Sequence, residues 1–557
     1  MPNRDPSSTS VGDVVDQLTS SGTTTISVAD RIRLCRQCLD LVVAVARDWT
    51  ESAARAKGCP NDPLVLAEDL LSGPAVVLRQ LQLSIQTLTA LEAGQCPRLP
   101  GPVRRLPGDQ LAVSVFPTTG FFDSLTFFGL SSEVRMQPGV SEDRIFGRLG
   151  EQAGGSEISG TSVVLGAGNV SSIPATDSLN RILFERRRVV LKMNPVNEYL
   201  APLFQQALGP LIREDLLRIV TGDAAVGAAL VRNERITDVH ITGSTATHDA
   251  IVWGTDAAER QVRRQKNEPL INKPVTSELG NVTPWIVVPG QYSEKQLQSQ
   301  AQHVAASITN NASFNCLATK VIVTWDQWEQ RDRFLELLNN SLAATPLRPA
   351  YYPGAAERYV RFSGRDVSPD DRNRLPWTLL TGQSVDERPE LFTEESFVCV
   401  CAETTLSADC PAGFLSLATE FVNERLTGTL CASVTVPPGF RRQYPQEIAQ
   451  CLSHLRYGSV GVNQWTGLAY GLMSPPWGAY PGATLQNVVS GIGSVHNTYL
   501  LDNFEKTVLD GPLINFPKPI WWSAHREALA TAERLLALYN SPSVLKLPGL
   551  FLKALSG

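Results

Sequence analysis

Short apolar runs that alternate with helical segments dominate the chain from about residue 160 onward. Strand-like runs occur at residues 161–165, 188–192, 217–220 and 238–242, and segments of helical composition separate them. Strand–helix units of this length predict a parallel sheet that helices cover on both faces. Ligands bind at the carboxyl ends of the strands in such sheets, so the residues that follow each run are the first candidates for a site.

Other signals place this α/β region within a longer chain. Before about residue 92 the apolar positions recur at helical spacing, which predicts a largely helical first region. A second α/β stretch is expected between about residues 275 and 475. A chain of 557 residues is too long for one core, so two or three domains are expected.

The composition excludes several classes of protein. A net charge of −6, with acidic and basic residues interspersed, argues against a nucleic-acid binder, which usually has a basic face. The ten cysteines lack the paired spacing of zinc ligands, so no metal site is predicted. The first eight residues are polar, unlike a secretory signal, and no apolar run approaches the roughly 20 residues that cross a bilayer. We therefore expect a cytoplasmic protein with free thiols.

Two residues 38 positions apart are suited to covalent chemistry. Glu278 closes an extended run, and Cys316 follows a helical one. A thiol can attack a carbonyl carbon, and a carboxylate can activate water to hydrolyse the thioester that results. A single cysteine is more often a buried core residue, so the interpretation depends on the other motifs that accompany Cys316 in the sequence.

Eight short motifs in a fixed order resemble those of the aldehyde dehydrogenase superfamily, across about residues 160–508. They are Gly168-Asn169, Val190-Leu191-Lys192, Val220-Thr221-Gly222, Ile241-Thr242-Gly243-Ser244, Glu278-Leu279-Gly280, Asn311 to Cys316, Glu395-Ser396-Phe397 and Gly461-Val462-Asn463. Each motif is weak alone, but eight in this order rarely arise by chance. The resemblance implies an α/β fold with a Rossmann-type cofactor domain, an α/β catalytic domain and a small oligomerisation element.

The resemblance also implies roles for individual residues. Cys316 would be the nucleophile, Glu278 the base that activates water, and Asn169 the amide that holds the oxyanion together with the Cys316 backbone N–H. Lys192 would bond a cofactor ribose, and Gly243-Ser244 would approach the pyrophosphate at a helix start. The remaining cofactor contacts would come from Gly222, Glu395 and Phe397.

The implied reaction is NAD(P)-dependent oxidation of an aldehyde to the carboxylic acid through a cysteine thioester. The abundance of Phe, Trp and Leu near the C-terminus suggests a hydrophobic aldehyde. Pro195 stands where NAD-preferring members often carry a glutamate, so we expect NADP to be accepted as well as NAD. A homodimer or homotetramer is expected from the resemblance alone.

Departures from the family pattern keep two alternatives open. Asn281, Ser313-Phe314, Val398-Cys399 and His248 replace residues usual in the family, and Phe314 is expected to narrow the approach to Cys316. A catalytically silent scaffold is therefore one alternative. A CoA-acylating or reductive enzyme is the other, although Glu278 argues against it because acylating members tend to lack that base.

The resemblance suggests how the chain divides. We expect residues 1–159 to form the helical region with part of the oligomerisation element, 160–275 the cofactor domain and 276–475 the catalytic domain. Residues 476–511 would return to the cofactor domain and the oligomerisation element. Residues 512–557 form an extension, which we call the C-terminal segment. A strap packed on the subunit or its partner is favoured for it over a lid or a shallow membrane contact, because basic residues are few and Pro548 is expected to break its last helix.

Overall fold

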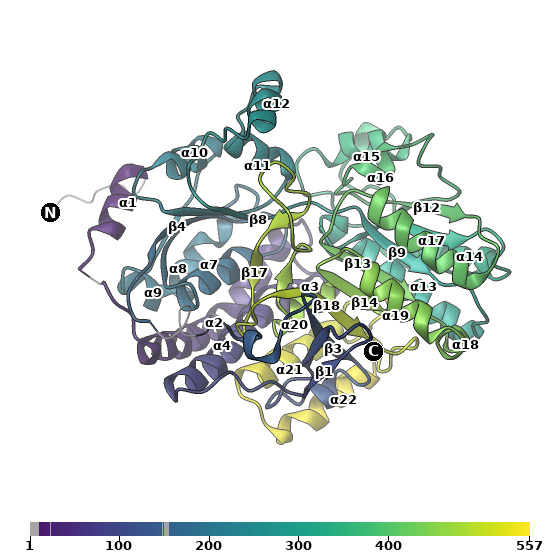
Figure 1. Cartoon of the computed structure of the whole chain (residues 1–557), viewed down its shortest axis with the longest axis horizontal. Helices are drawn as coiled ribbons and strands as arrows, with labels where there is room; N and C mark the ends of the chain where they lie inside the picture. The colour runs from purple at the N-terminus through teal and green to yellow at the C-terminus, as the bar shows by residue number, and fades with distance from the viewer. Residues whose placement is uncertain (1–10, 23, 148, 150–154) are drawn as a thin grey trace.

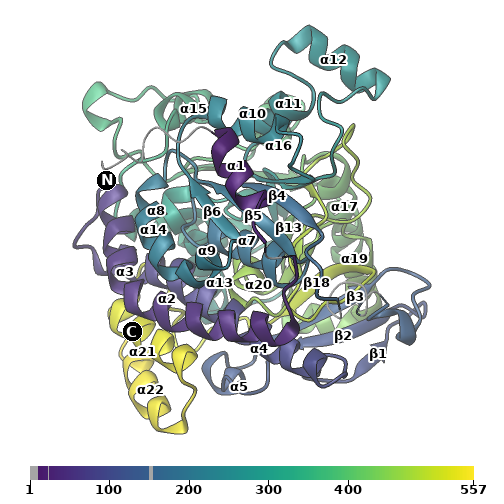
Figure 2. The ribbon, with the colours of Figure 1, turned by 90° about the vertical axis from the view of Figure 1, so that its left-hand side faces the viewer.

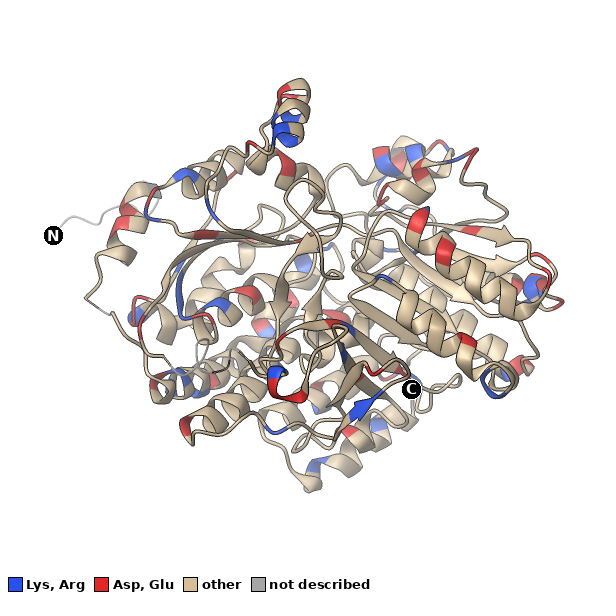
Figure 3. Cartoon of the chain, viewed as in Figure 1, with Lys and Arg blue, Asp and Glu red and all other residues tan. Residues whose placement is uncertain are grey.

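Two α/β bodies lie side by side in the computed structural model, which describes residues 11–22, 24–147, 149 and 155–557. Figure 1 shows one sheet on the left and the other on the right, with α2 (Val28–Ala56), α4 (Val76–Glu92) and the C-terminal segment along the lower side. Basic and acidic residues are interspersed along the described chain (Figure 3).

The first region is helical, as predicted. The hydroxyl of Ser27 accepts a hydrogen bond from the Asp30 N–H (3.0 Å) and the Asp30 carboxylate accepts one from the Ser27 N–H, so a capping box begins the long helix α2. Cys35 and Cys38 are buried core thiols on this helix. The helices are α1 (Val11–Thr19), α2 (Val28–Ala56), α3 (Pro63–Leu70), a π-helical turn (Leu71–Ala75) and α4 (Val76–Glu92).

The left-hand sheet has six strands in the order β16-β8-β7-β4-β5-β6. All neighbours are parallel except the antiparallel pair β16 and β8. The four strand-like runs predicted after residue 160 are present here. The strands are β4 (Gly160–Leu165), β5 (Arg187–Lys192), β6 (Leu217–Val220), β7 (Asp238–Thr242), β8 (Val275–Glu278) and β16 (Gly491–Ile492). The helices of this region are α7 (Ile173–Leu183), α8 (Ala201–Ala207), α9 (Gly209–Arg213), α10 (Ala224–Arg232), α11 (Thr245–Val252) and α12 (Ala257–Lys266).

The right-hand sheet has ten strands in the order β1-β2-β3-β18-β14-β13-β9-β10-β12-β11. The strands from β18 to β11 are parallel, and β1, β2 and β3 extend this sheet as an antiparallel arm of the same chain. The strands are β1 (Val103–Arg105), β2 (Leu111–Phe116), β3 (Ser131–Met136), β9 (Thr283–Val287), β10 (Thr319–Trp325), β11 (Thr378–Leu380), β12 (Val400–Leu406), β13 (Cys431–Thr435), β14 (Ser459–Val462) and β18 (Phe504–Asp510).

Helices on this side of the molecule include α13, which leads into the segment with Cys316. They are α5 (Asp123–Thr126), α13 (Glu294–Thr309), α14 (Arg331–Ala344), α15 (Ala355–Ser363), α16 (Glu390–Thr393), α17 (Pro411–Glu424), α18 (Pro438–Gln443), α19 (Pro445–His454) and α20 (Gly467–Leu472). A separate antiparallel pair is formed by β15 (Trp477–Gly478) and β17 (Ser494–His496).

The C-terminal segment packs on the first helical region of its own chain. Helix α21 (Ala528–Asn540) contacts α2, α3 and α4, and α22 (Leu547–Leu555) packs on α21; Figure 2 shows α21 below α2. The expectation that Pro548 breaks the last helix is wrong. Pro548 lies in the first turn of α22, where its missing N–H would have had no helical partner, so the residue starts the helix.

The described residues contain neither a candidate membrane-spanning helix nor a group of metal ligands. No helix in the described ranges combines the length and the apolar character needed to cross a membrane. Within the same residues, His, Cys, Asp and Glu side chains do not gather in groups of three or more that could hold a metal ion.

Candidate active site

A cavity of about 160 Å³ lies where the first helices, the two sheets and the C-terminal segment meet. Among the described residues that line it, the charged ones are Glu68 and Glu278, and most of the others are apolar or aromatic. We call it the main cavity; its lining includes Leu71, Val76, Phe127, Val170, Ile173, Cys316, Trp465, Leu468, Tyr470, Trp477, Ile520, Trp521, Leu535 and Tyr539.

Cys316 and Glu278 meet in the wall of this cavity. Glu278 ends β8, and its Oε1 accepts a hydrogen bond from the Cys316 thiol at 3.3 Å. The Trp477 indole N–H donates to the other carboxylate oxygen at 2.7 Å, which fixes the orientation of the carboxylate. Sequence reasoning did not identify Trp477, because no local pattern relates it to a residue 199 positions earlier.

Burial changes the proton affinity of both groups. It raises the pKa of Glu278 to about 7, with a further contribution from the negative charge of Asp177. Burial, with the charges of Glu278 and Glu395, raises the pKa of the Cys316 thiol well above its usual value. The resting thiol is therefore protonated, and the carboxylate in contact with it is a base matched to neutral pH.

The loop that carries Cys316 has an unusual backbone. Asn311, Ala312 and Ser313 have φ values of 51°, 53° and 69°, in the left-handed region that non-glycine residues seldom adopt. The Asn311 side-chain amide donates to the Phe314 and Asn169 carbonyls, each at 2.9 Å. These bonds secure the turn that precedes Cys316.

Asn169 lies against the same loop. Its side-chain N–H donates to the Phe314 carbonyl at 3.1 Å, and it lines a small cavity beside Gly168 and Tyr351. Asn169 is not among the residues that line the main cavity. The structure thus brings Asn169 to the Cys316 loop, whereas Glu278 contacts the thiol itself.

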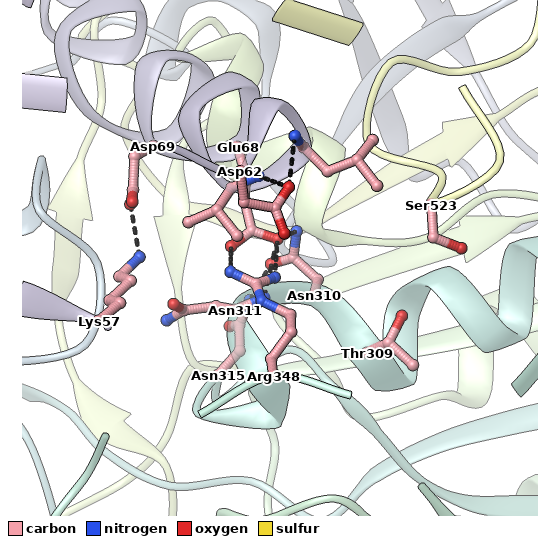
Figure 4. A network of polar contacts seen from close by, with 12 residues as sticks. Lys57, Asp62, Glu68, Asp69, Thr309, Asn310, Asn311, Asn315, Arg348 and Ser523 are labelled. Atoms are coloured by element: carbon pink, nitrogen blue, oxygen red, sulfur yellow. Dashed lines mark hydrogen bonds and ion pairs between the residues drawn. The ribbon is translucent and has the colours of Figure 1, made fainter. Parts of the chain in front are cut away.

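A buried carboxylate from the first helical region anchors this loop from the other side. Glu68, on α3, accepts hydrogen bonds from the Asn311 N–H (3.0 Å) and the Asn310 side-chain amide (3.1 Å). The Arg348 guanidinium binds both Glu68 oxygens, at 2.9 and 3.0 Å (Figure 4). Burial opposes the charge of Glu68, but Arg348 outweighs it and the pKa of this carboxyl is lowered. The helical spacing of apolar residues in this region did not predict that Glu68 contacts the Cys316 loop.

The expected cofactor residues lie at the carboxyl ends of neighbouring strands. Lys192 ends β5, and Gly222 follows β6 with a φ of +126°. Gly243 and Ser244 follow β7, where Ser244 caps α11 and the Gly243 N–H donates to the Glu278 carbonyl (3.0 Å).

Glu395 and Phe397 approach from the other sheet. Burial raises the pKa of Glu395 to about 7, and its Oε1 is buried without a hydrogen-bond partner in the described part of the chain. Phe397 packs against Tyr352 and Phe314, with ring centroids 5.1 and 6.0 Å apart.

Comparison with known proteins agrees with this geometry. Residues 180–353 match the model of the aldehyde dehydrogenase family. Three of the solved structures with this fold cover about nine tenths of both chains. They are the aldehyde dehydrogenase KauB from Pseudomonas aeruginosa (16% identity, TM-score 0.58, 90% of this chain and 88% of that one), an NAD-dependent aldehyde dehydrogenase from Sinorhizobium meliloti (18%, 0.58, 92% and 88%) and an NADP dependent enzyme from E. coli (17%, 0.57, 90% and 90%). No curated protein sequence gives a match.

The chain has the fold of the aldehyde dehydrogenases, and residues 180–353 match their family model. The α/β fold class predicted from the sequence is confirmed by these structures. Several residues that depart from the aldehyde dehydrogenase pattern form hydrogen bonds with other residues of the chain.

Two departures from the aldehyde dehydrogenase pattern bond to each other. The Ser313 hydroxyl, in the Cys316 loop, donates to the Val398 carbonyl at 3.1 Å. The buried Lys320 ammonium donates to both, at 3.0 Å to the Ser313 hydroxyl and 2.9 Å to the Val398 carbonyl. Burial lowers the pKa of Lys320 to about 8. The three residues join the Cys316 loop to the segment that holds Glu395 and Phe397.

Other departures fill the core of this aldehyde dehydrogenase fold. The Asn281 amide donates to the Thr283 hydroxyl (2.8 Å) and the Cys431 carbonyl (3.0 Å), which ties the start of β9 to β13. Phe314 is buried among aromatic side chains and does not line the main cavity. The expectation that Phe314 narrows the approach through this cavity is therefore wrong.

Proposed function

We propose that this aldehyde dehydrogenase oxidises an apolar aldehyde to the carboxylic acid, with NADP or NAD as cofactor and Cys316 as nucleophile. The observation that carries the proposal is the Cys316 thiol bonded to the Glu278 carboxylate in the wall of an apolar cavity. The two residues predicted to do the covalent chemistry are in direct contact.

The first step follows from this contact. Glu278 takes the thiol proton while the sulfur forms a bond to the aldehyde carbon, and the carbonyl electrons move to its oxygen. Asn169 and the Cys316 backbone N–H are the proposed donors to that oxyanion, an interaction typically worth about 2.7–4 kcal/mol in the transition state. When bound, NAD or NADP supplies the acceptor for the hydride that leaves the substrate carbon.

The second step returns the enzyme to its starting state. The proton first taken from the thiol passes to solvent, and the Glu278 carboxylate then removes a proton from water as that water attacks the thioester carbon. The carbon–sulfur bond breaks, the acid leaves, and the thiolate recovers a proton from Glu278. A pKa of about 7 suits both directions of proton transfer at neutral pH.

The residues present suit a nicotinamide dinucleotide. Glu395 offers a buried oxygen without a partner among the described residues, which would accept a hydrogen bond from a ribose hydroxyl. Ser244 stands at the start of α11, where exposed N–H groups favour a phosphate. A Cβ at Gly243 would meet no atom within 4 Å, so a ligand can approach this backbone closely.

Cofactor choice depends on the surroundings of Lys192. Pro195 leaves the position of the family's ribose-binding glutamate without a carboxylate, which favours acceptance of the 2′-phosphate of NADP. The charges of Glu198 and Asp223 nevertheless act on Lys192 and oppose the lowering of its pKa by burial. We propose that both cofactors are used.

The lining of the main cavity supports a proposal for the substrate class. Leu, Ile, Val and aromatic side chains provide most of its wall, and no Lys or Arg is among its described lining residues. A neutral, apolar aldehyde therefore fits better than an anionic one. The homo-oligomer, the cytoplasmic location and the domain boundaries stay predictions.

Production of reduced nicotinamide from a panel of aliphatic and aromatic aldehydes, with NAD and with NADP, tests the proposal. We expect turnover that disappears in Cys316→Ala and persists in Cys59→Ala, which removes a half-buried cysteine outside the main cavity. Turnover that requires CoA would support the acylating alternative. Cofactor binding without turnover under any condition would support the silent scaffold.

A further inference from the structure

A second cavity of about 100 Å³ adjoins the main cavity. The two share five lining side chains: Phe127, Leu468, Ile520, Trp521 and Leu535. The C-terminal segment provides three of these five, together with most of the other residues around the second cavity. The extension therefore forms the boundary between the catalytic cavity and its neighbour.

The polar side chains around the second cavity already form hydrogen bonds with other groups of the protein. Gln464 donates to the Pro512 carbonyl (2.9 Å), Asn515 bonds to His303 (3.2 Å), and Lys518 donates to the Ala524 carbonyl (2.9 Å). The hydroxyls of Thr126 and Thr531 donate to backbone carbonyls. The space between these groups is bounded by apolar side chains, which suits hydrocarbon.

Trp521 in the shared wall and two phenylalanines at the far end of the second cavity are the side chains that a bound chain would pass. The Trp521 indole N–H is buried without a hydrogen-bond partner in the described chain, so a rotation of this ring breaks no hydrogen bond. At the far end, Phe128 and Phe516 line the cavity while 74% and 70% exposed, so the cavity reaches the surface there.

We propose that the second cavity binds the distal hydrocarbon of a long unbranched aldehyde whose carbonyl lies at Cys316. The C-terminal segment thereby sets the length of substrate that the enzyme prefers. This inference rests on the proposed function and deepens it: it assigns a chain-binding subsite and a specificity role to residues 512–557. Apolar contact in the second cavity replaces exposure of the same methylene groups to water.

The test compares two matched substitutions on α22. Ala554 lines the second cavity, so Ala554→Trp fills it, whereas Leu552, two residues earlier, is 67% exposed and lines neither cavity. For each protein, kcat/KM is measured with unbranched aldehydes from butanal to dodecanal. In the unmodified enzyme we expect kcat/KM to rise by up to about fourfold for each added methylene that becomes buried.

Ala554→Trp should keep butanal turnover within twofold and lose at least about tenfold in kcat/KM for dodecanal, the equivalent of two buried methylenes. Leu552→Trp should follow the unmodified enzyme throughout. Phe516→Asp, at the exposed end, provides a second test and should also act selectively on long chains. Identical chain-length profiles in all four proteins, or equal losses for short and long aldehydes, would overturn the subsite.

Failure of the subsite and failure of the proposed function would give different results. If the unmodified enzyme oxidises butanal but Ala554→Trp and Phe516→Asp leave the profile unchanged, the subsite is wrong and the aldehyde oxidation stands. If no aldehyde of any length is oxidised, the proposed function itself is wrong.

Discussion

Replacing Glu68 by glutamine would remove the charge that anchors the nucleophile loop while keeping the size of the side chain. The three left-handed residues Asn311, Ala312 and Ser313 each cost roughly 1–2 kcal/mol, or about 3–6 kcal/mol together. Two hydrogen bonds from this loop to the Glu68 carboxylate stabilise the loop by about 1.5–3 kcal/mol each. The anchor and the strain are thus of similar size, and losing the anchor allows the loop to relax.

Two effects should be seen in Glu68→Gln. Arg348 would become a buried guanidinium without its carboxylate, which costs about 3–5 kcal/mol of unfolding free energy, measured by chemical denaturation. The loop would also shift Cys316 relative to Glu278, and a displacement near 1 Å lowers kcat by about 100-fold. Steady-state kinetics should show the fall in kcat with a smaller change in KM.

The double variant Glu68→Gln/Arg348→Met separates stability from positioning. Removing both charges leaves no unpaired group, so the free energy of unfolding should recover in large part. The loop would still lack its anchor, so kcat should stay low. Glu357→Gln, at a side chain that is 71% exposed, is the matched control and should change neither quantity. A kcat within twofold of normal in Glu68→Gln would refute the positioning role.

Three further outcomes are expected from the charges around the site. First, kcat/KM should rise with pH and level off above about 7, because Glu278 acts as a base only when deprotonated; a flat profile between pH 5 and 9 would contradict this. Second, burial raises the pKa of Glu395 from 4.5 to about 7, so the folded state holds a proton that the unfolded chain has released between these values. The contribution of Glu395 to the free energy of unfolding is complete below pH 4.5 and is lost as the pH rises through 7. Glu395→Gln should remove about 1–3 kcal/mol of this pH dependence, which chemical denaturation at pH 4.5 and at pH 8 would measure. Third, Asp223→Asn keeps the cap of α10 but removes a negative charge near Lys192, so the ratio of kcat/KM for NADP to that for NAD should rise about three- to tenfold. Asp256→Asn, at the cap of α12, is the control and should leave the ratio unchanged.

Much of the framework was predictable because it depends on local patterns. Apolar runs predicted β4 to β7, and the residues after them placed Lys192, Gly222 and Gly243 at one edge of the sheet. The order of the motifs also predicted that Glu278 and Cys316 work together, and the thiol bonds to the carboxylate. Local propensity determines where strands end, and parallel pairing brings those ends together.

The rest of the site depends on pairs that are distant in the sequence and have no local signature. Trp477 reaches Glu278 across 199 positions, and Arg348 reaches Glu68 across 280. Neither residue belongs to a motif. Each contact exists because separate packed elements converge on one cavity, which a single sequence without its fold does not reveal.

Each residue that departs from the family pattern suggests a damaged site when it is considered alone. Ser313 and Val398 each replace a residue usual in the superfamily, which suggested a damaged site. In the structure the Ser313 hydroxyl, the Val398 carbonyl and the Lys320 ammonium form one buried network. A buried ammonium without these acceptors would be costly, so Lys320 depends on the Ser313 hydroxyl and on the position of the Val398 backbone carbonyl. They join the loop of Cys316 to the segment of Glu395, and the proposed oxidation by hydride transfer requires Cys316 to be held at a fixed distance from the proposed cofactor residues.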